Sequence, residues 1–341
     1  MLSKKIFVLL ITIGILSSFV FAQSLSKTGT TAAKFLSVGL GADANAMGGA
    51  VVADVSGPEA MYWNVSGIAS ESRNNALFSY TKMFADVNVN FVGVVIPAGE
   101  IGNFGVNVTA LNYGEMEVTT EDYPDGTGET FTAGSYAFGI SYARNITDLF
   151  SFGINLKYIR EDISKSSAEG VAIDLGTMFI TPFWDIRLGT SITNFGTKMH
   201  ITGDDLLVRY DNDPQTLGNN ESMDAYLSTD YFELPLRLQI GIAKDFNFGS
   251  DYRITLTADA IYPNDNKPWV NVGSEIGLFH NLVLVRIGYK TLFLPETQEG
   301  LTAGIGIFYN KIPYFGIKFS YAYQQLKDLD NLHSFGINLL F

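Results

Sequence analysis

The sequence predicts an all-β fold, a transmembrane antiparallel β-barrel of about fourteen strands with an N-terminal hatch segment. Three observations lead to this fold class. Apolar and polar residues alternate through long runs, the connections between the runs are alternately short and long, and the chain ends on an aromatic residue. Period-two alternation turns one face of a strand toward an apolar environment and the other toward a polar one.

The alternation is clearest between Glu233 and Leu292, where four runs of about a dozen residues follow one another. The first run alternates Leu236, Leu238, Ile240 and Ile242 with Arg237, Gln239, Gly241 and Ala243. The runs leave no room for crossover helices, so they predict neighbouring antiparallel strands rather than βαβ units.

The connections distinguish a membrane barrel from a soluble β-sandwich or propeller, the competing architecture. Short connections such as 98–100 and 182–183 alternate with long ones such as 113–130, 161–167 and 196–232, although the first outer connection, near Ala85, is tight. Short periplasmic turns and long outer loops are typical of outer-membrane barrels. The strands are expected at 75–84, 86–97, 101–112, 131–145, 147–161, 168–182, 183–197, 233–247, 250–263, 267–279, 281–292, 299–311, 312–325 and 332–341.

The first 22 residues have the features of a cleaved signal peptide. Lys4 and Lys5 precede an apolar core, 6–16, that is too short to span a bilayer, and Ala22 precedes the expected cleavage point. The sequence has no cysteine, which excludes a lipoprotein anchor. No later run of about 18 apolar residues predicts a helical membrane protein. We therefore expect a signal peptide at 1–22, a hatch at 23–73 and a barrel at 74–341 in the outer membrane of a Gram-negative-type bacterium.

Composition agrees with a barrel. Charged residues make up 17% of the chain, below the quarter that is typical of soluble proteins, while 17 Tyr and 25 Phe suit strands and interfacial belts. The net charge of −13 comes largely from the loops at 113–130 and 196–232. The first interpretation of these acids is a solvated, repulsive outer face. A second is calcium binding by Asp204, Asp205, Asp211 and Asp213, whose spacing lacks an EF-hand pattern.

The stretch from Phe35 to Ala69 differs from the rest, because it is rich in Gly and Ala and hardly alternates. Its Gly39-x-Gly41 string could pass for a dinucleotide fingerprint with Glu59 as the ribose acid, but that site needs a βαβ unit. Close backbone packing in a confined space is the better explanation for Gly39, Gly41, Gly48 and Gly49. Residues 59–63 are expected to form a short helical turn that ends at Asn64.

This stretch resembles the opening of the PorV/PorQ family of outer-membrane barrels, which are similar to the FadL fatty-acid channels. The resemblance is carried by 35–36, 39–42, 46–50, 62–64 and 67–69, and the C-terminal pattern ending at Phe341 fits it. It implies that the segment folds into the barrel as a hatch. The residues matched in the hatch motif are Gly39, Gly41, Met47, Gly48, Gly49, Trp63, Asn64 and Gly67.

The sequence departs from the family pattern at three positions. Asp43 stands where the family usually has an arginine, and Val65 and Ser66 stand where proline and alanine are usual. An acid in place of a base would reverse any ion pair that the family makes at that position.

The polar strand faces carry charges that are expected to point into the lumen: Lys157, Asp174, Asp185, Arg187, Arg237, Arg253, Asp259, Glu275, Arg286, Lys290 and Lys318. One interpretation is that they pair across strands and around the hatch. The other is a selectivity lining for an anionic or amphipathic solute, with Arg187, Arg237, Asp259, Glu275, Arg286 and Lys290 as its candidates.

An enzyme is not predicted. The chain has three histidines and no G-x-S-x-G string or paired-histidine metal motif. An outer-rim hydrolase using His200 or His333 with a loop aspartate is the weaker alternative. We expect no cofactor, no metal and no nucleic-acid partner.

Two functions stay open. The resemblance favours a secretion-linked docking or cargo-handover component of type IX secretion, with loop 196–232 facing an exported protein. The alternative is a FadL-like channel for hydrophobic or amphipathic molecules, with a fatty-acid-like ligand. Outer-membrane lipids are partners in both.

Overall fold

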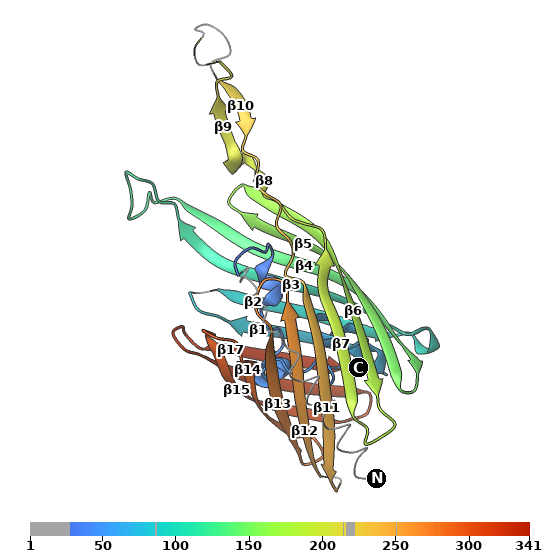
Figure 1. Cartoon of the computed structure of the whole chain (residues 1–341). Coiled ribbons are helices and arrows are strands. Elements are labelled where there is room, and N and C mark those ends of the chain that lie inside the picture. Colours follow the sequence, from blue (N-terminus) through green and yellow to red (C-terminus); the bar gives the residue numbers. More distant parts are fainter. Residues whose placement is uncertain (1–27, 86, 214, 216–221, 250) are drawn as a thin grey trace, which may run out of the picture.

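The computed structural model describes residues 28–341 except 86, 214, 216–221 and 250, so the signal peptide expected at 1–22 lies outside the described residues. Fourteen antiparallel strands form a closed ring (Figure 1). Pairing of β1 with β17 and of β5 with β6 closes it. The strands are β1 (Asn75–Lys82), β2 (Asn88–Pro97), β3 (Asn103–Glu117), β4 (Thr130–Thr147), β5 (Phe150–Ile163), β6 (Ser166–Ile180), β7 (Arg187–Gly196), β11 (Arg237–Phe248), β12 (Tyr252–Pro263), β13 (Trp269–Leu278), β14 (Val283–Leu292), β15 (Glu299–Ile312), β16 (Phe315–Leu326) and β17 (Leu332–Leu340).

The barrel prediction is confirmed, with corrections at three connections. The connection expected at 161–167 is a tight turn of Ser164 and Lys165, because β5 and β6 pair as far as Ile163 and Ser166. The loop expected from residue 113 starts later, since β3 pairs with β4 up to Glu117. Asp185 was expected to face the lumen from a strand, but it lies exposed in the turn between β6 and β7, with φ at +49°.

The long connection at 196–232 is partly ordered into strands. Residues of β8 (Thr202–Gly203) pair with β6, and a short helix, η4 (Asp204–Leu206), follows. A hairpin of β9 (Leu207–Tyr210) and β10 (Met223–Tyr226) then projects beyond the barrel end (Figure 1). We call this the long-loop end and the opposite one the short-turn end.

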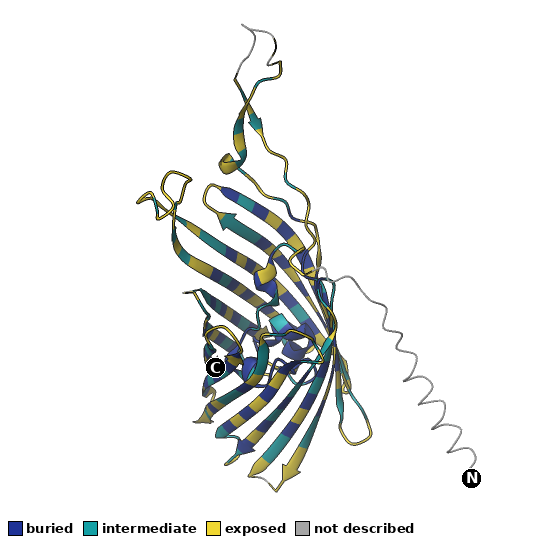
Figure 2. Cartoon of the chain, turned by 60° about the vertical axis from the view of Figure 1, so that its left-hand side comes forward, coloured by how far each residue is buried: buried dark blue, intermediate teal, exposed yellow. Residues whose placement is uncertain are grey.

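The distribution of polarity is the reverse of that in a soluble protein. Along each strand, buried and exposed residues alternate, which gives the striped strands of Figure 2. On β11, Ile240 is 51% exposed whereas its neighbour Gln239 is fully buried. On β14, Ile287 is exposed and Arg286 is buried. An apolar outer face around a polar interior is what lipid requires of a barrel. No helix among the described residues is long and apolar enough to cross a membrane.

The N-terminal segment, residues 28–74, lies inside the ring (Figure 1). It contains η1 (Lys34–Ser37), α2 (Ala42–Ala46), α3 (Ala60–Trp63) and η2 (Val65–Ser70). The helical turn expected before Asn64 is α3, and Asn64 is its C-cap. Helix α2 contacts β14 to β17, and η2 contacts β3 to β6, so the segment bridges the barrel interior.

Candidate functional site

Glycines in the N-terminal segment and in the barrel wall let the two backbones pack directly against each other. Gly48 has φ at +68°, and a methyl group on it would come within 3 Å of the Tyr289 backbone on β14. From the other side, a methyl group on Gly288 would come within 3 Å of Gly48. Two glycines that face each other let the two main chains touch.

The same contact is made around the barrel by inward-facing glycines, a signal that the sequence reasoning missed. Their position on the polar face of successive strands could have indicated where an inner segment packs. The wall glycines that a methyl group would push against the segment are Gly93, Gly105, Gly153, Gly176, Gly189, Gly241, Gly273, Gly288 and Gly304.

The remaining hatch-motif residues connect the segment internally or to the wall. Trp63 donates Nε1–H to the carbonyl of Leu40 (2.9 Å), and Asn64 donates to the carbonyls of Val52 (2.7 Å) and Thr177 of β6 (3.0 Å). Gly49 lies against the Trp63 ring, and Gly39 against Asn45. Gly67 packs on the Val55 carbonyl, Gly41 on the Glu59 carboxyl, and Met47 is buried against Gly273. The motif residues therefore lie together in one folded unit.

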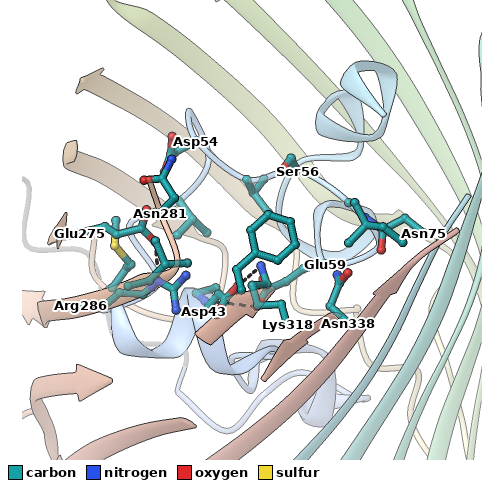
Figure 3. Close-up of a pocket in the computed structure, with 18 of the residues that line it drawn as sticks. Asp43, Asp54, Ser56, Glu59, Asn75, Glu275, Asn281, Arg286, Lys318 and Asn338 are labelled. Atoms are coloured by element: carbon teal, nitrogen blue, oxygen red, sulfur yellow. Dashed lines mark hydrogen bonds and ion pairs between the residues drawn. The ribbon is translucent and has the colours of Figure 1, made fainter. Parts of the chain in front are cut away.

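A cavity of about 340 Å³ lies at the short-turn end, between the segment and the ends of β12 to β17 (Figure 3). Its charged lining residues include Asp43, Glu59, Glu275, Arg286 and Lys318. The lining also includes apolar side chains, namely Met47, Val51, Val55, Leu284, Phe308 and Leu340, so the cavity presents both charged and apolar surface.

Asp43 is the centre of an ion-pair network in this chamber. Its carboxylate pairs with Arg286 of β14 (2.7 Å) and with Lys318 of β16. Arg286 in turn pairs with Glu275 (2.6 Å), which also pairs with Arg253. Burial acts to raise the pKa of Asp43, but the Arg286 and Lys318 cations hold this pKa well below its usual range. An acid at this position thus complements a basic wall.

Glu59 is the second acid of the network. Burial raises its pKa to about 8, and the neighbouring Asp43 carboxylate acts in the same direction. One of its oxygens accepts the backbone N–H of Ala44 (3.1 Å). Glu59 is therefore largely protonated near neutral pH, whereas Asp43 is charged.

A second cavity, of about 610 Å³, lies on the other side of the segment toward the long-loop end. It combines Lys34, Arg237, Asp265 and Glu299 with the apolar surface of Trp269, Leu294 and three prolines. Lys34 and Thr31 of the segment both bond Asp265 of the β12–β13 connection, the threonine at 3.0 Å. The lining is amphipathic.

The candidate lumen residues divide between the two cavities and the space between them. Arg187 pairs with Asp54 and with Asp245 (2.6 Å), and Lys290 pairs with Glu299 (2.6 Å). Glu275 and Arg286 belong to the Asp43 network. Arg237 stacks beneath Tyr62 and Trp63, with 5.7 and 5.6 Å to the ring centroids. Asp259 accepts the Val52 N–H (2.9 Å).

The outer loop acids do not assemble a metal site in the described part of the chain, where no group of three or more His, Cys, Asp or Glu could hold an ion. Asp205 instead accepts hydrogen bonds from the Lys165 N–H (2.8 Å) and the Ser166 hydroxyl (3.0 Å). His200 packs on Tyr231, and His333 shares a 2.8 Å hydrogen bond with Tyr321.

No protein-family model matches the sequence, and no curated protein matches it. The fold, however, is that of FadL-type barrels. The structure is similar to the CymD monoaromatic hydrocarbon channel over 89% of this chain and 97% of that one, with a TM-score of 0.58 at 14% identity. It is similar to the Pseudomonas putida toluene transporter TodX over 87% and 95% (TM-score 0.56, 12% identity). For a Pseudomonas aeruginosa FadL homologue the coverage is 89% and 98% (TM-score 0.55, 11% identity). The resemblance to PorV/PorQ stays a prediction.

Proposed function

We propose that the protein is a non-enzymatic outer-membrane channel that takes up hydrophobic or amphipathic small molecules. The observation that carries this proposal is a closed barrel whose interior is divided by a packed N-terminal segment into two cavities. The FadL-type fold supports it over nearly the whole chain, because the similar barrels are described as hydrocarbon channels or transporters. The second cavity, at the long-loop end, has an amphipathic lining and favours a solute with both an apolar and a polar part.

Uptake tests the proposal directly. Cells that lack the protein should accumulate a labelled fatty acid or alkylbenzene more slowly than cells that express it, and the purified barrel should retain such a compound for mass spectrometry. Equal uptake in both strains, at equal amounts of other porins, would contradict a transport function.

The hairpin of β9 and β10 offers a control that separates transport from the secretion-linked alternative. The Leu227 N–H bonds the Leu206 carbonyl (2.9 Å), so residues 207–226 can be replaced by a short Gly-Ser turn. A channel should keep its uptake after this deletion. A docking component that uses the hairpin should lose cargo release.

The segment acts as a hatch in this proposal, and a disulfide can lock it. A Cβ on Gly336 of β17 would lie 3.5 Å from the Cβ of Ala42, close to the mean of about 3.8 Å in disulfides. The chain has no cysteine, so Ala42→Cys with Gly336→Cys gives an otherwise cysteine-free pair. Oxidation should block uptake and reduction restore it, while each single variant should be insensitive to both. Undiminished uptake by the fully oxidised pair would show that the segment need not leave β17.

A further inference from the structure

The charges around the short-turn cavity do not balance. Four acids and four bases in and beside it pair with one another, namely Asp43, Asp54, Asp245 and Glu275 with Arg187, Arg253, Arg286 and Lys318. Glu59 and Glu71 also line the cavity, and neither forms an ion pair with any described residue. The bases are therefore all engaged, and two carboxyl groups of the N-terminal segment are left over.

The two leftover carboxyl groups have neutral partners only. Glu59 accepts the Ala44 N–H (3.1 Å), and Glu71 accepts the side-chain amide of Asn75 (3.0 Å). The cations nearest to Glu59 are Arg286 and Lys318, and both bond Asp43 instead. An opposite charge beside a buried carboxyl favours its ionised form, so a cation that enters the cavity would stabilise Glu59 as a carboxylate.

Two buried amide oxygens lie in the same part of the wall. Asn75 of β1 and Asn338 of β17 line the cavity, and they are 3% and 7% exposed. In each, Oδ1 has no hydrogen-bond partner within the described part of the chain. The two residues are neighbours across the sheet, because Asn75 lies opposite Leu340, two residues from Asn338. Figure 3 shows both on the side of the cavity where Glu59 lies, away from Glu275 and Arg286.

This side of the cavity thus offers hydrogen-bond acceptors to a ligand. A carboxylate ligand would find every lining base already paired and would face Glu59 and Glu71. A bare metal ion is not favoured either, since no group of three or more His, Cys, Asp or Glu among the described residues could hold one. An alkylammonium ion fits, because its N–H groups donate to the acceptors and its chain contacts the apolar lining of Met47, Val51, Val55, Leu284, Phe308 and Leu340. The volume of about 340 Å³ lies within the range of small-molecule sites.

The outer loops favour the same sign of charge. Residues 113–130 contain six acids and no Lys or Arg, and acidic surfaces raise the local concentration of cations. The cavity at the long-loop end carries no net charge, because Lys34, Arg237 and Lys267 are balanced by Asp265, Glu296 and Glu299. A cation therefore meets acids at the entrance and again at the short-turn end.

We propose, on the basis of the transport function above, that the short-turn cavity binds solutes whose polar end is a primary ammonium group. Glu59, Glu71 and the amide oxygens of Asn75 and Asn338 hold the ammonium group, and the apolar lining holds the chain. The transported solutes are then amphipathic amines.

Three solutes of equal chain length test the proposal on the purified wild-type barrel. Hexylammonium, hexan-1-ol and hexanoate differ only in the charge of the polar end, and isothermal titration at pH 8 in a non-ionic detergent measures the affinity of each. Hexylammonium should bind at least about tenfold more tightly than the other two, because hydrogen bonds to charged groups are the strong ones. Equal or tighter binding of the alcohol or of hexanoate would overturn the proposal, as would no binding of hexylammonium.

Glu59→Gln and Glu71→Gln locate the site, since each change keeps the shape of the side chain and removes its charge. Each should weaken hexylammonium binding by about tenfold and leave hexan-1-ol unaffected. The matched control is Glu100→Gln, in the exposed turn between β2 and β3 at the same end of the barrel, which should keep all wild-type affinities. Wild-type affinity for hexylammonium in both cavity variants would overturn the site.

Uptake of a neutral alkylbenzene separates failure of this site from failure of the transport function. Protein-dependent alkylbenzene uptake without any preference for hexylammonium would leave a channel and remove the ammonium site. Uptake that does not depend on the protein would contradict the transport function, whereas the titration on the purified barrel would still decide whether the cavity binds the ammonium group.

Discussion

Two walls of the same barrel receive the N-terminal segment in different ways. On the wall made by β13 to β16, Asp43 meets Arg286 and Lys318, so charge is matched by charge. On the wall made by β7, β11 and β12, several buried polar atoms of Gln239 and Arg237 have no hydrogen-bond partner among the described residues. The ionic wall holds the segment through the ion pairs of Asp43, whereas the polar wall holds it through the Arg187–Asp54 pair and the Val52–Asp259 hydrogen bond. Substitutions should have large effects in the Asp43 network and small effects at the unpartnered polar atoms of the second wall.

The largest effect is expected from Asp43→Arg. The change places a third cation beside Arg286 and Lys318, and breaking a buried ion pair typically costs about 3–5 kcal/mol. Urea unfolding of the barrel in detergent, followed by gel mobility without heating, should show this loss or a failure to assemble. The control is Asp224→Arg on the projecting hairpin, where the partner Arg209 is well exposed and stability should not change. Equal stability of the two variants would mean that the ionic wall does not hold the segment.

The glycine contact on the same wall gives the next largest effect. In Gly288→Ala the new methyl group meets the Gly48 backbone, and overpacking of this kind costs about 1–3 kcal/mol. Gly300→Ala on β15 is the control, because its nearest neighbour atom lies 3.8 Å away. The same unfolding assay should separate the two variants, and protease cleavage within residues 28–74 should rise only in Gly288→Ala. A wild-type profile for Gly288→Ala would show that the segment can shift at no cost.

Titration of Glu59 should give the ionic wall a pH dependence. Its pKa is about 8 in the folded protein and about 4.3 in an unfolded chain, so between these values the folded state binds more protons. The free energy of unfolding therefore falls as pH rises through this window, with a slope of up to about 1.4 kcal/mol per pH unit. Burial also raises the pKa of Asp54 and acts with the same sign.

The variant Glu59→Gln isolates this contribution, because the amide keeps the shape but does not ionise. Between pH 5 and pH 8, the free energy of unfolding should fall less in the variant than in the wild type. Parallel pH profiles for the two proteins would show that a group other than Glu59 causes the pH dependence.

The sequence predicted the strands far better than it predicted which polar side chains pair with one another inside the barrel. Alternation is local, so residues such as Ile240 and Gln239 are assigned to opposite faces from their neighbours alone, and all fourteen strands were found. The prediction was wrong at one turn. Phe183 and Trp184 were expected to begin a strand that would have turned Asp185 inward, but all three residues lie in the turn before β7. The tight turn at Ser164 and Lys165 was missed because polar residues do not mark where pairing stops.

Pairing across the lumen could not be predicted, because it depends on the register between strands and on where the segment sits. Asp43 is visible in the sequence as a departure from a family pattern, but its partners are more than 240 residues away in the chain. In the sequence, Gln239 is one polar residue among several on an alternating strand. Its importance comes only from having Ser191 as its neighbour and no hydrogen-bond partner among the described residues.

The smallest expected effect compares one threonine on each kind of wall. Thr81 of β1 shares a 2.9 Å hydrogen bond with Ser334, whereas the equally buried Thr193 of β7 has an unpartnered hydroxyl among the described residues. Thr81→Val should lower the free energy of unfolding by about 1 kcal/mol, because it removes one partner of a buried hydrogen bond. Thr193→Val should change it little, because the hydroxyl has no hydrogen-bond partner to lose among the described residues. Both changes keep the side-chain shape, so the difference between the two unfolding free energies isolates the hydroxyl. A larger loss in Thr193→Val than in Thr81→Val would show that Thr193 has a fixed partner, and the contrast between the two walls would then fail at its most sensitive point.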